Sequence, residues 1–246
     1  MTHRGRILAA LAGLGLLAGC IGDANASQLP GQPPSTVLAA ALATLAAGAT
    51  AHIDIAATTP QGSITCSGDT TASGGWQVIK SGTGQRVVIM LGNGVGYVAG
   101  NISGLERFLD VPGDEARSHA GQWIAVRPGQ LVGEHSYRDI TGGIALPAVA
   151  SEVTPTGPLT LTAPAIVAGQ PAIGVQGRAP AGQHFPPTAR ATLYVTINGA
   201  RPLLYELSGA SGYTDQVTFS NWGGSVQLAA PPHAIPAGTL RQAVLT

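Results

Sequence analysis

The chain has 246 residues, with twelve Lys and Arg against twelve Asp and Glu, and only 10% of its residues are charged. This weakly charged, balanced composition lacks the basic surface that nucleic-acid binding needs, so no nucleic-acid partner is expected. Apolar residues make up 44% of the chain, which is too many for a disordered protein. The 35 glycines and 18 prolines favour short strands and turns over long helices.

Residues 1–19 have the pattern of a signal peptide: basic residues first, then an apolar run over residues 7–18. This run is shorter than the roughly 20 residues needed to span a bilayer. The segment ends in Leu17-Ala18-Gly19-Cys20, which resembles the lipobox of bacterial lipoproteins. The resemblance implies export, cleavage before Cys20, and a diacylglyceryl group on its thiol that holds the chain to the outer face of the cytoplasmic membrane. The alternative is an ordinary signal peptide in which the cysteine falls by chance.

The next segment, residues 20–35, is polar, small and proline-bearing, as in a flexible tether. Residues 36–246 are enough for a single domain. Residues 36–47 are rich in Ala and Leu and predict a helix, with Ser35 as the N-cap and Gly48 as the stop. Because this helix is apolar nearly all round, we expect it to be buried.

Beyond the helix, short β-rich segments dominate, separated by Gly, Pro and Asn turns. The strands expected from alternation are 51–58, 76–81, 86–91, 95–99, 123–126, 159–161, 172–178, 191–198, 203–207, 216–219 and 225–229. Gly92-Asn93-Gly94 marks a tight hairpin. Helical turns are expected over 103–109, and a weaker helical region over 130–153. The pattern predicts an α+β domain in which a few helices cover one face of a large antiparallel sheet or open barrel.

Several stretches resemble a known family in their order along the chain. They are Val95-Gly96-Tyr97-Val98-Ala99-Gly100, Gly121-Gln122-Trp123-Ile124-Ala125-Val126, the 191–207 strand pair, and Val217-Thr218-Phe219-Ser220-Asn221-Trp222-Gly223 followed by Ala230-Pro231-Pro232. This order is similar to exported lipoproteins of the LppX/LprG type, which are related in shape to the LolA lipoprotein carrier. The resemblance implies a curved half-barrel sheet wrapped around helices, with an apolar cavity that takes acyl chains. It also implies a lipid or lipoglycan ligand and an envelope transport protein as partners.

Candidate cavity residues follow from alternation, because successive side chains of a strand face opposite sides of the sheet. They are Ile53, Ile55, Val88, Met90, Tyr97, Trp123, Leu193, Val195 and Phe219. Which face of each strand points inward is not fixed by alternation, and a shift of one residue moves a whole set to the other face.

Two further residue types have open interpretations. Cys66, which is left without an intramolecular partner if Cys20 is lipidated, is either a reactive thiol or a small buried side chain in a strand. Trp76, Trp123 and Trp222 either line a ligand cavity or belong to ordinary core.

The sequence carries no recognisable catalytic or metal-binding motif. The sequence has no G-x-S-x-G nucleophile elbow, no P-loop, and no His or Cys spacing typical of zinc. The acidic residues Glu106, Asp110, Asp114 and Glu115 indicate a solvated loop rather than a calcium site, because the D-x-D-x-D-G pattern is absent. No enzymatic activity and no cofactor are therefore expected.

The sequence leaves two candidate functions. The first is a membrane-anchored envelope lipoprotein that binds, carries or presents a lipid or lipidated molecule. The second is a non-catalytic surface or scaffold lipoprotein with a filled core and a protein partner. They differ in whether an apolar cavity is open beneath the sheet.

Overall fold

The computed structural model describes residues 29–47, 50–60, 62–180, 188–208 and 213–240. The expected signal peptide, Cys20 as the expected lipidation site, and the first part of the expected tether lie outside these ranges. The helices are α1 (Pro34–Ala46), α2 (Ile102–Leu109), α3 (Gly113–His119), α4 (Tyr137–Thr141) and α5 (Leu146–Glu152), with a 3-10 turn at Ala237–Thr239. The strands are β1 (Ala51–Thr59), β2 (Gly62–Thr70), β3 (Gly75–Ser81), β4 (Arg86–Gly92), β5 (Val95–Gly100), β6 (Ile124–Val126), β7 (Leu131–Val132), β8 (His135–Ser136), β9 (Thr156–Leu161), β10 (Ala165–Val167), β11 (Gln170–Arg178), β12 (Arg190–Thr196), β13 (Pro202–Ser208), β14 (Thr214–Ser220) and β15 (Ile235–Pro236).

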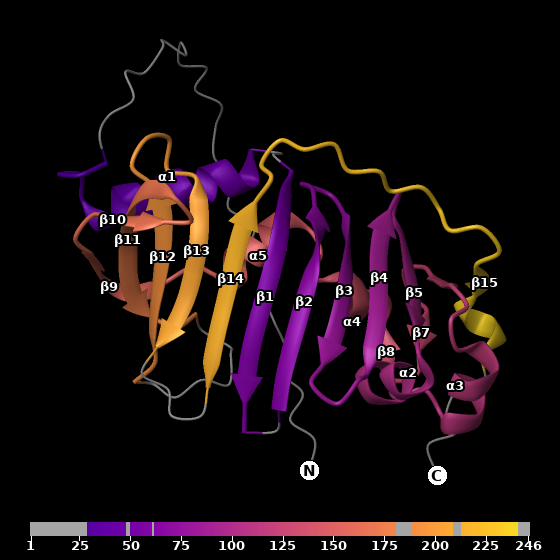
Figure 1. Ribbon diagram of the computed structural model, residues 1–246. Coiled ribbons are helices and arrows are strands. Elements are labelled where there is room, and N and C mark those ends of the chain that lie inside the picture. Colours follow the sequence, from indigo (N-terminus) through magenta and orange to yellow (C-terminus); the bar gives the residue numbers. More distant parts are fainter. Residues whose placement is uncertain (1–28, 48–49, 61, 181–187, 209–212, 241–246) are drawn as a thin grey trace.

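One large, open, curved sheet forms the body of the protein (Figure 1). Its strand order is β10-β11-β12-β13-β14-β1-β2-β3-β4-β5-β6-β15, with β9 also paired to β11. All pairings are antiparallel except the short one between β15 and β6. The described helices are few and small beside this sheet. The α+β class expected from the sequence, and the large curved sheet with a few helices, are confirmed.

The sheet consists of two runs of neighbouring strands that meet in its centre. Strands β1 to β6 follow one another along the chain, and so do β10 to β14. The two runs join where β1 pairs with β14, in a register that sets Ile53 opposite Phe219 and Ile55 opposite Val217. Strands from opposite ends of the chain therefore lie side by side in the middle of the molecule.

The helices lie on one face of the sheet, which we call the helix face; the other is the open face (Figure 1). Helices α1 and α5 pack on the half formed by β1 and β11–β14. Helices α2 and α4 pack on the half formed by β4–β6, with α3 against α2. The helix face thus has two separate covers rather than one.

Helix α1 begins earlier than the sequence predicted. Pro33 is its N-cap and Pro34 its first residue, so Ser35 lies inside the helix. Proline suits the first helical turn because its missing N–H has no intrahelical partner to lose. Leu29 is buried in the core beside this helix. The fold therefore includes part of the segment expected to be a tether.

The expected hairpin after β4 is present, with Asn93 (φ 52°) and Gly94 (φ 72°) as its two central residues. Both have positive φ, as the two-residue turn that matches strand twist requires. The weaker helical region expected over 130–153 contains the two short helices α4 and α5, and Pro147 lies in the first turn of α5.

One strand expected from alternation is absent, and one helix was missed. Residues 225–229 are not a strand, because the chain there crosses the ends of the sheet on its way from β14 to β15 (Figure 1). Leu228 packs beside Gly74 and Gly92 at those strand ends, where no free edge is available for pairing. Helix α3 occupies part of the acidic segment expected to be a loop, and its Glu115 is buried.

Candidate ligand groove

Two packed cores lie on the helix face and leave a seam between them. We call them the α1 core and the α2 core. The α1 core includes Leu45, Ile53, Leu193, Tyr205 and Phe219. The α2 core includes Val87, Ile89, Val98, Leu105, Ile124 and Ile140. Two residues of β2 that face the helices, Ile64 and Cys66, belong to neither core.

The floor of this seam is apolar and incompletely covered. Strand pairing sets Ile55 opposite Cys66 and Cys66 opposite Ile79, so all three side chains point to the helix face. Ile55 and Ile79 are only half-buried, and Ile64 keeps 40% of its surface exposed. Exposed aliphatic side chains on an otherwise covered sheet face are what a groove for an apolar ligand would require.

A cavity of about 390 Å³ continues this seam at the ends of β2 and β3, beneath helix α2. We call the seam and the cavity together the ligand groove. The cavity is lined by Thr59, Gly62, Ser63, Ile64, Ser81, Gly82, Thr83, Gln85, Arg107, Phe108, Asp110 and His135. Ile64 and Phe108 supply its apolar wall. Arg107 and the His135–Asp110 ion pair, with 3.1 Å between Nε2 and Oδ2, supply its polar rim.

Buried polar groups border the seam on the α1 side. Burial raises the pKa of the Asp215 carboxyl, and burial together with the charge of Asp215 raises the pKa of Glu152 on α5. The pKa of Tyr205 is also raised, first by burial and then by Asp215. The Tyr205 hydroxyl and Asp215 Oδ1 are buried without a hydrogen-bond partner in the described part of the chain. This side of the seam therefore favours neutral groups over further negative charge.

Cys66 lies at the middle of the seam as a buried, free thiol. Burial is the main cause that raises its pKa to about 12, with smaller contributions from the charges of Asp54 and Glu152. A thiol in this environment stays protonated and reacts slowly. The interpretation of Cys66 as a buried side chain in a strand is confirmed.

The structure divides the nine candidate cavity residues between the two faces. Five point to the helix face: Ile53, Ile55, Leu193, Val195 and Phe219. Of these five, only Ile55 borders the seam, since the other four are fully packed in the α1 core.

The other four candidates, Val88, Met90, Tyr97 and Trp123, lie on the open face. Met90 pairs with Tyr97 and Val88 with Ala99, whereas the neighbours Val87 and Ile89 are the residues that enter the α2 core. The apolar run of β4 has no polar alternation to mark its inward side, so the expected face was reversed there. Ile64, Ile79 and Phe108 were missed because their exposure depends on where helices stop covering the sheet.

The open face carries a larger cavity, of about 820 Å³, beside the start of α2. Val88 and Trp123 line it, together with Arg86, Ala99, Gly100, Asn101, Ile102, Ser103, Ala120 and Gly121. Two residues expected to line a cavity therefore do so, but on the face opposite the helices.

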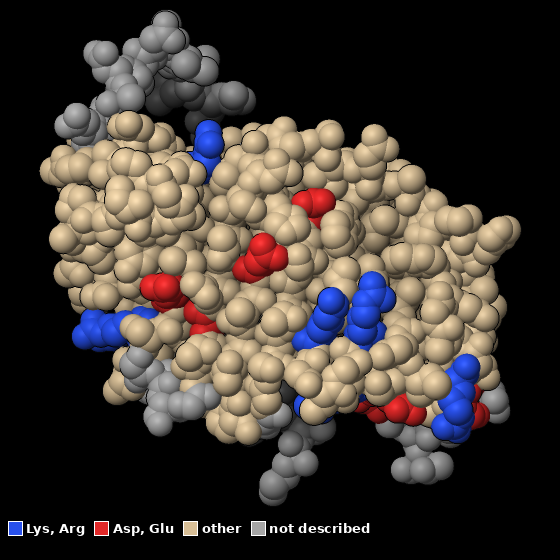
Figure 2. Space-filling model, viewed as in Figure 1, with Lys and Arg blue, Asp and Glu red and all other residues tan. Residues whose placement is uncertain are grey.

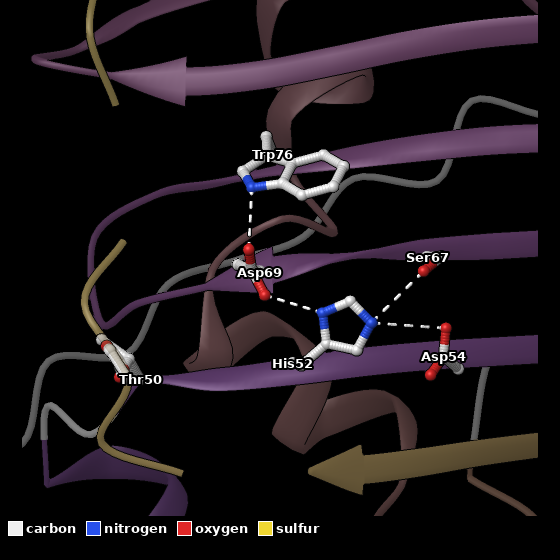
Figure 3. Close-up of polar contacts among 7 residues, drawn as sticks. Thr50, His52, Asp54, Ser67, Asp69 and Trp76 are labelled. Carbon is white, nitrogen blue, oxygen red and sulfur yellow. Dashed lines mark hydrogen bonds and ion pairs between the residues drawn. The ribbon is translucent and has the colours of Figure 1, made fainter. Parts of the chain in front are cut away.

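A polar network on the open face joins β1, β2 and β3 (Figure 3). His52 Nδ1 donates to Asp69 Oδ1 at 2.7 Å, and Trp76 Nε1 donates to Asp69 Oδ2 at 3.0 Å. Ser67 Oγ lies 3.3 Å from His52 Nε2, and Asp54 Oδ1 lies 3.5 Å from the same nitrogen. The order hydroxyl, imidazole, carboxylate is that of a hydrolase triad.

Two features of this network oppose a catalytic role. The carboxylate of Asp54 competes with Ser67 for Nε2, the nitrogen that a general base would use. Strand β2 is paired on both sides, so its backbone N–H groups are taken up by the sheet and none is free to stabilise an oxyanion. The network instead ties three strands together and gives the Trp76 indole a partner.

No group of three or more His, Cys, Asp or Glu side chains in the described ranges is placed to hold a metal ion. Among the helices that the structure describes, none has the length and apolar character needed to cross a membrane.

The fold defined here, an open curved sheet with small helices on one face, recurs in solved structures. LprF from Mycobacterium bovis is similar over 80% of this chain and 96% of its own, with 14% sequence identity and a TM-score of 0.50. Lipoprotein LppX from Mycobacterium tuberculosis is similar over 79% of this chain and 99% of its own, again with 14% identity and a TM-score of 0.50. A LolA-superfamily protein from Nitrosomonas europaea matches more loosely, with 12% identity and a TM-score of 0.30. No protein-family model and no curated protein matches the sequence.

Proposed function

We propose that this protein is a lipid-anchored envelope lipoprotein that binds, carries or presents a lipid in the ligand groove. The observation that carries the proposal is the incompletely covered apolar floor of the seam, where Ile64 packs in neither core and Ile55 and Ile79 stay half-buried at the edges of the two cores. The fold shared with LprF and LppX supports the same role by analogy, and a shared fold alone does not fix a function.

An acyl chain suits the groove better than a polar ligand. Its floor is aliphatic, and Phe108 adds an aromatic wall at the α2 end. Burying each methylene of a chain contributes about 0.8 kcal/mol. The raised pKa values of Asp215 and Glu152 on the α1 side disfavour a negatively charged group there. The polar end of the ligand is therefore expected at the rim formed by Arg107, Asp110 and His135.

The test is a titration of the soluble protein from residue 29, which keeps Leu29 in the core, with monoacylglycerols of increasing chain length. Affinity should rise with each added methylene and level off when the groove is full. Ile64→Trp should shorten the longest chain accepted. Ile102→Trp, a change of the same size at a similarly exposed isoleucine on the open-face cavity, should not.

Absence of binding at every chain length, from a protein that melts cooperatively, would contradict the carrier role. That result would favour the alternative, a scaffold lipoprotein with a filled core and a protein partner. Native mass spectrometry of the freshly purified protein would show whether a lipid is retained through purification.

The proposed anchor at Cys20 has a separate test. Cys20→Ala should leave the precursor uncut and remove the acyl mass, because the thiol is the acceptor of the diacylglyceryl group. Two acyl chains give stable anchoring whereas one does not, so the acyl mass also reports how firmly the protein is held. Retention of the acyl mass in the Cys20→Ala protein would refute this assignment.

A further inference from the structure

The open-face cavity beside α2 is unrelated to the ligand groove and is held by a defined set of hydrogen bonds. The Asn101 side-chain oxygen accepts from the backbone N–H of Gly104 at 2.8 Å and of Arg86 at 3.0 Å, and its amide donates to Gly84 O at 2.9 Å. These bonds fix the start of α2 against the first residue of β4. The Gly121 N–H donates to Gly100 O at 2.8 Å and fixes the opposite wall.

The floor of this cavity is apolar. Val88 and Ala99 are directly opposed on β4 and β5, and Trp123 lies next to Ile124, which pairs with Val98. Val88 and Trp123 are half-buried, and Ile102 at the rim keeps 40% of its surface exposed. A cavity of about 820 Å³ with such a floor is within the usual size range of small-molecule sites.

One end of the cavity is positively charged. Arg86 lines it, and Lys80 stands directly opposite Arg86 on β3. No ion pair joins either side chain to a carboxylate in the described ranges. Like charges directly opposed on neighbouring strands are destabilising unless something neutralises them. Charged side chains are sparse on this face, so little else offsets the pair (Figure 2).

We propose that this cavity binds a single-chain amphiphile with an anionic head group. The chain lies on Val88, Ala99 and Trp123, and the head group lies between Arg86 and Lys80. A guanidinium binds a phosphate or carboxylate through two parallel hydrogen bonds, and the neighbouring ammonium adds a second positive charge. The site is independent of the ligand groove, because the two open on opposite faces of the sheet.

The same face supplies a matched control. Arg178 and Arg190 are also a directly opposed, exposed pair of cations, on β11 and β12. Neither arginine lines the open-face cavity beside Arg86. Any binding that depends on positive charge alone would therefore respond to both pairs, and binding to the cavity would respond to one.

The experiment uses the full chain in dodecyl maltoside micelles and a diazirine-bearing dodecyl phosphate as a photo-crosslinking probe. The large excess of neutral amphiphile occupies purely apolar surfaces, so a surviving crosslink reports the head group. We expect saturable crosslinks on peptides that contain Ile102 and Trp123. The double substitution Lys80→Gln/Arg86→Gln should lower their yield about tenfold, whereas Arg178→Gln/Arg190→Gln should leave it unchanged.

Three further readouts make the outcome decisive. Unlabelled dodecyl phosphate should compete, and inorganic phosphate at the same concentration should not. Val88→Trp, which fills the floor without a change of charge, should abolish the crosslink while circular dichroism stays native. Because Lys80 and Arg86 repel each other, the double Gln variant should melt no earlier than the parent.

The proposal would be overturned by any of three results: equal crosslinking in both double variants, displacement by inorganic phosphate, or crosslinks confined to groove residues such as Ile64.

Discussion

The two halves of the sheet carry their helices in different ways. In the α1 core, large side chains fill the space between sheet and helix, and Leu193, Tyr205 and Phe219 are almost wholly buried. In the α2 core, glycine lets the backbones approach closely, and a Cβ on Gly104 would clash with the backbone oxygen of Arg86. One half is thus held by large buried side chains and the other by close backbone approach at glycine. The seam of the ligand groove lies between these two cores.

The largest effect is expected from removing volume in the α1 core. Leu193→Ala deletes a fully buried side chain and should lower the free energy of unfolding by about 2–5 kcal/mol, since the packed surroundings collapse only partly. Urea denaturation of the soluble protein measures this. The control is Leu204→Ala on the open face, where the side chain is only half-buried and the loss should be smaller. Equal losses would mean that the α1 core is not tightly filled.

In the α2 core, adding volume instead of removing it is expected to destabilise the protein. Gly104→Ala adds a single methyl group, yet it should cost about 1–3 kcal/mol because the clash is with backbone that has no room to move. Ser103→Ala, one residue earlier in α2, is the control and should be nearly neutral. If Gly104→Ala were neutral as well, α2 would not be held by close backbone approach, and the contrast between the two halves would fail.

A third substitution tests the seam itself. Ile64→Ala removes a side chain that is already 40% exposed and belongs to neither core, so it should cost less than about 1 kcal/mol. Thermal unfolding of this variant beside Leu193→Ala is the measurement. A loss as large as that of Leu193→Ala would show that β2 is part of a continuous packed core, which would also weaken the proposed groove.

The smallest effect concerns pH and the α1 border of the seam. The pKa of Asp215 is raised in the folded state by burial, so its charged form is disfavoured there. Below its unfolded pKa of about 3.8 the carboxyl is protonated in both the folded and the unfolded state and does not lower the stability. As the pH rises above that value, ionisation favours the unfolded state, and the full loss of stability is reached above the folded pKa.

Asp215→Asn should therefore raise the Tm by a few degrees at pH 7, and the gain should vanish near pH 3. Part of the gain arises because the charge of Asp215 also raises the pKa of Glu152. Glu206→Gln on the open face is the control and should show no such pH-dependent gain. A gain that persists unchanged in acid would rule out charge burial as the cause.

The sequence was enough to predict most strands but not the faces they present. In β1, the polar residues His52 and Asp54 alternate with Ile53 and Ile55, and the inward face followed correctly. In β4 both faces are apolar, because Val88 lines a cavity on the open face. Polar and apolar residues therefore do not alternate along β4, and its inward face could not be told from its outward face. A strand that serves two apolar surfaces cannot be oriented from its own sequence.

The ligand groove was beyond sequence reasoning for a different reason. Exposure of Ile64 depends on the distance between two helical covers that come from residues far apart in the chain. No local pattern encodes that distance. The family resemblance supplied only the general expectation of a cavity between the sheet and its helices. By contrast, the hairpin at Asn93-Gly94 depends on local turn residues and was predicted correctly.

The pairing of β1 with β14 has a consequence for how the chain must fold. Strand β1 is among the first to be synthesised and β14 is nearly the last, so β1 remains an unpaired edge until most of the chain is present. An exposed edge strand is a template for pairing with other chains. Contacts between distant segments also slow folding, which prolongs that exposure. The Asp54 carboxylate on β1 places negative charge along this temporary edge, where it discourages association between incomplete copies.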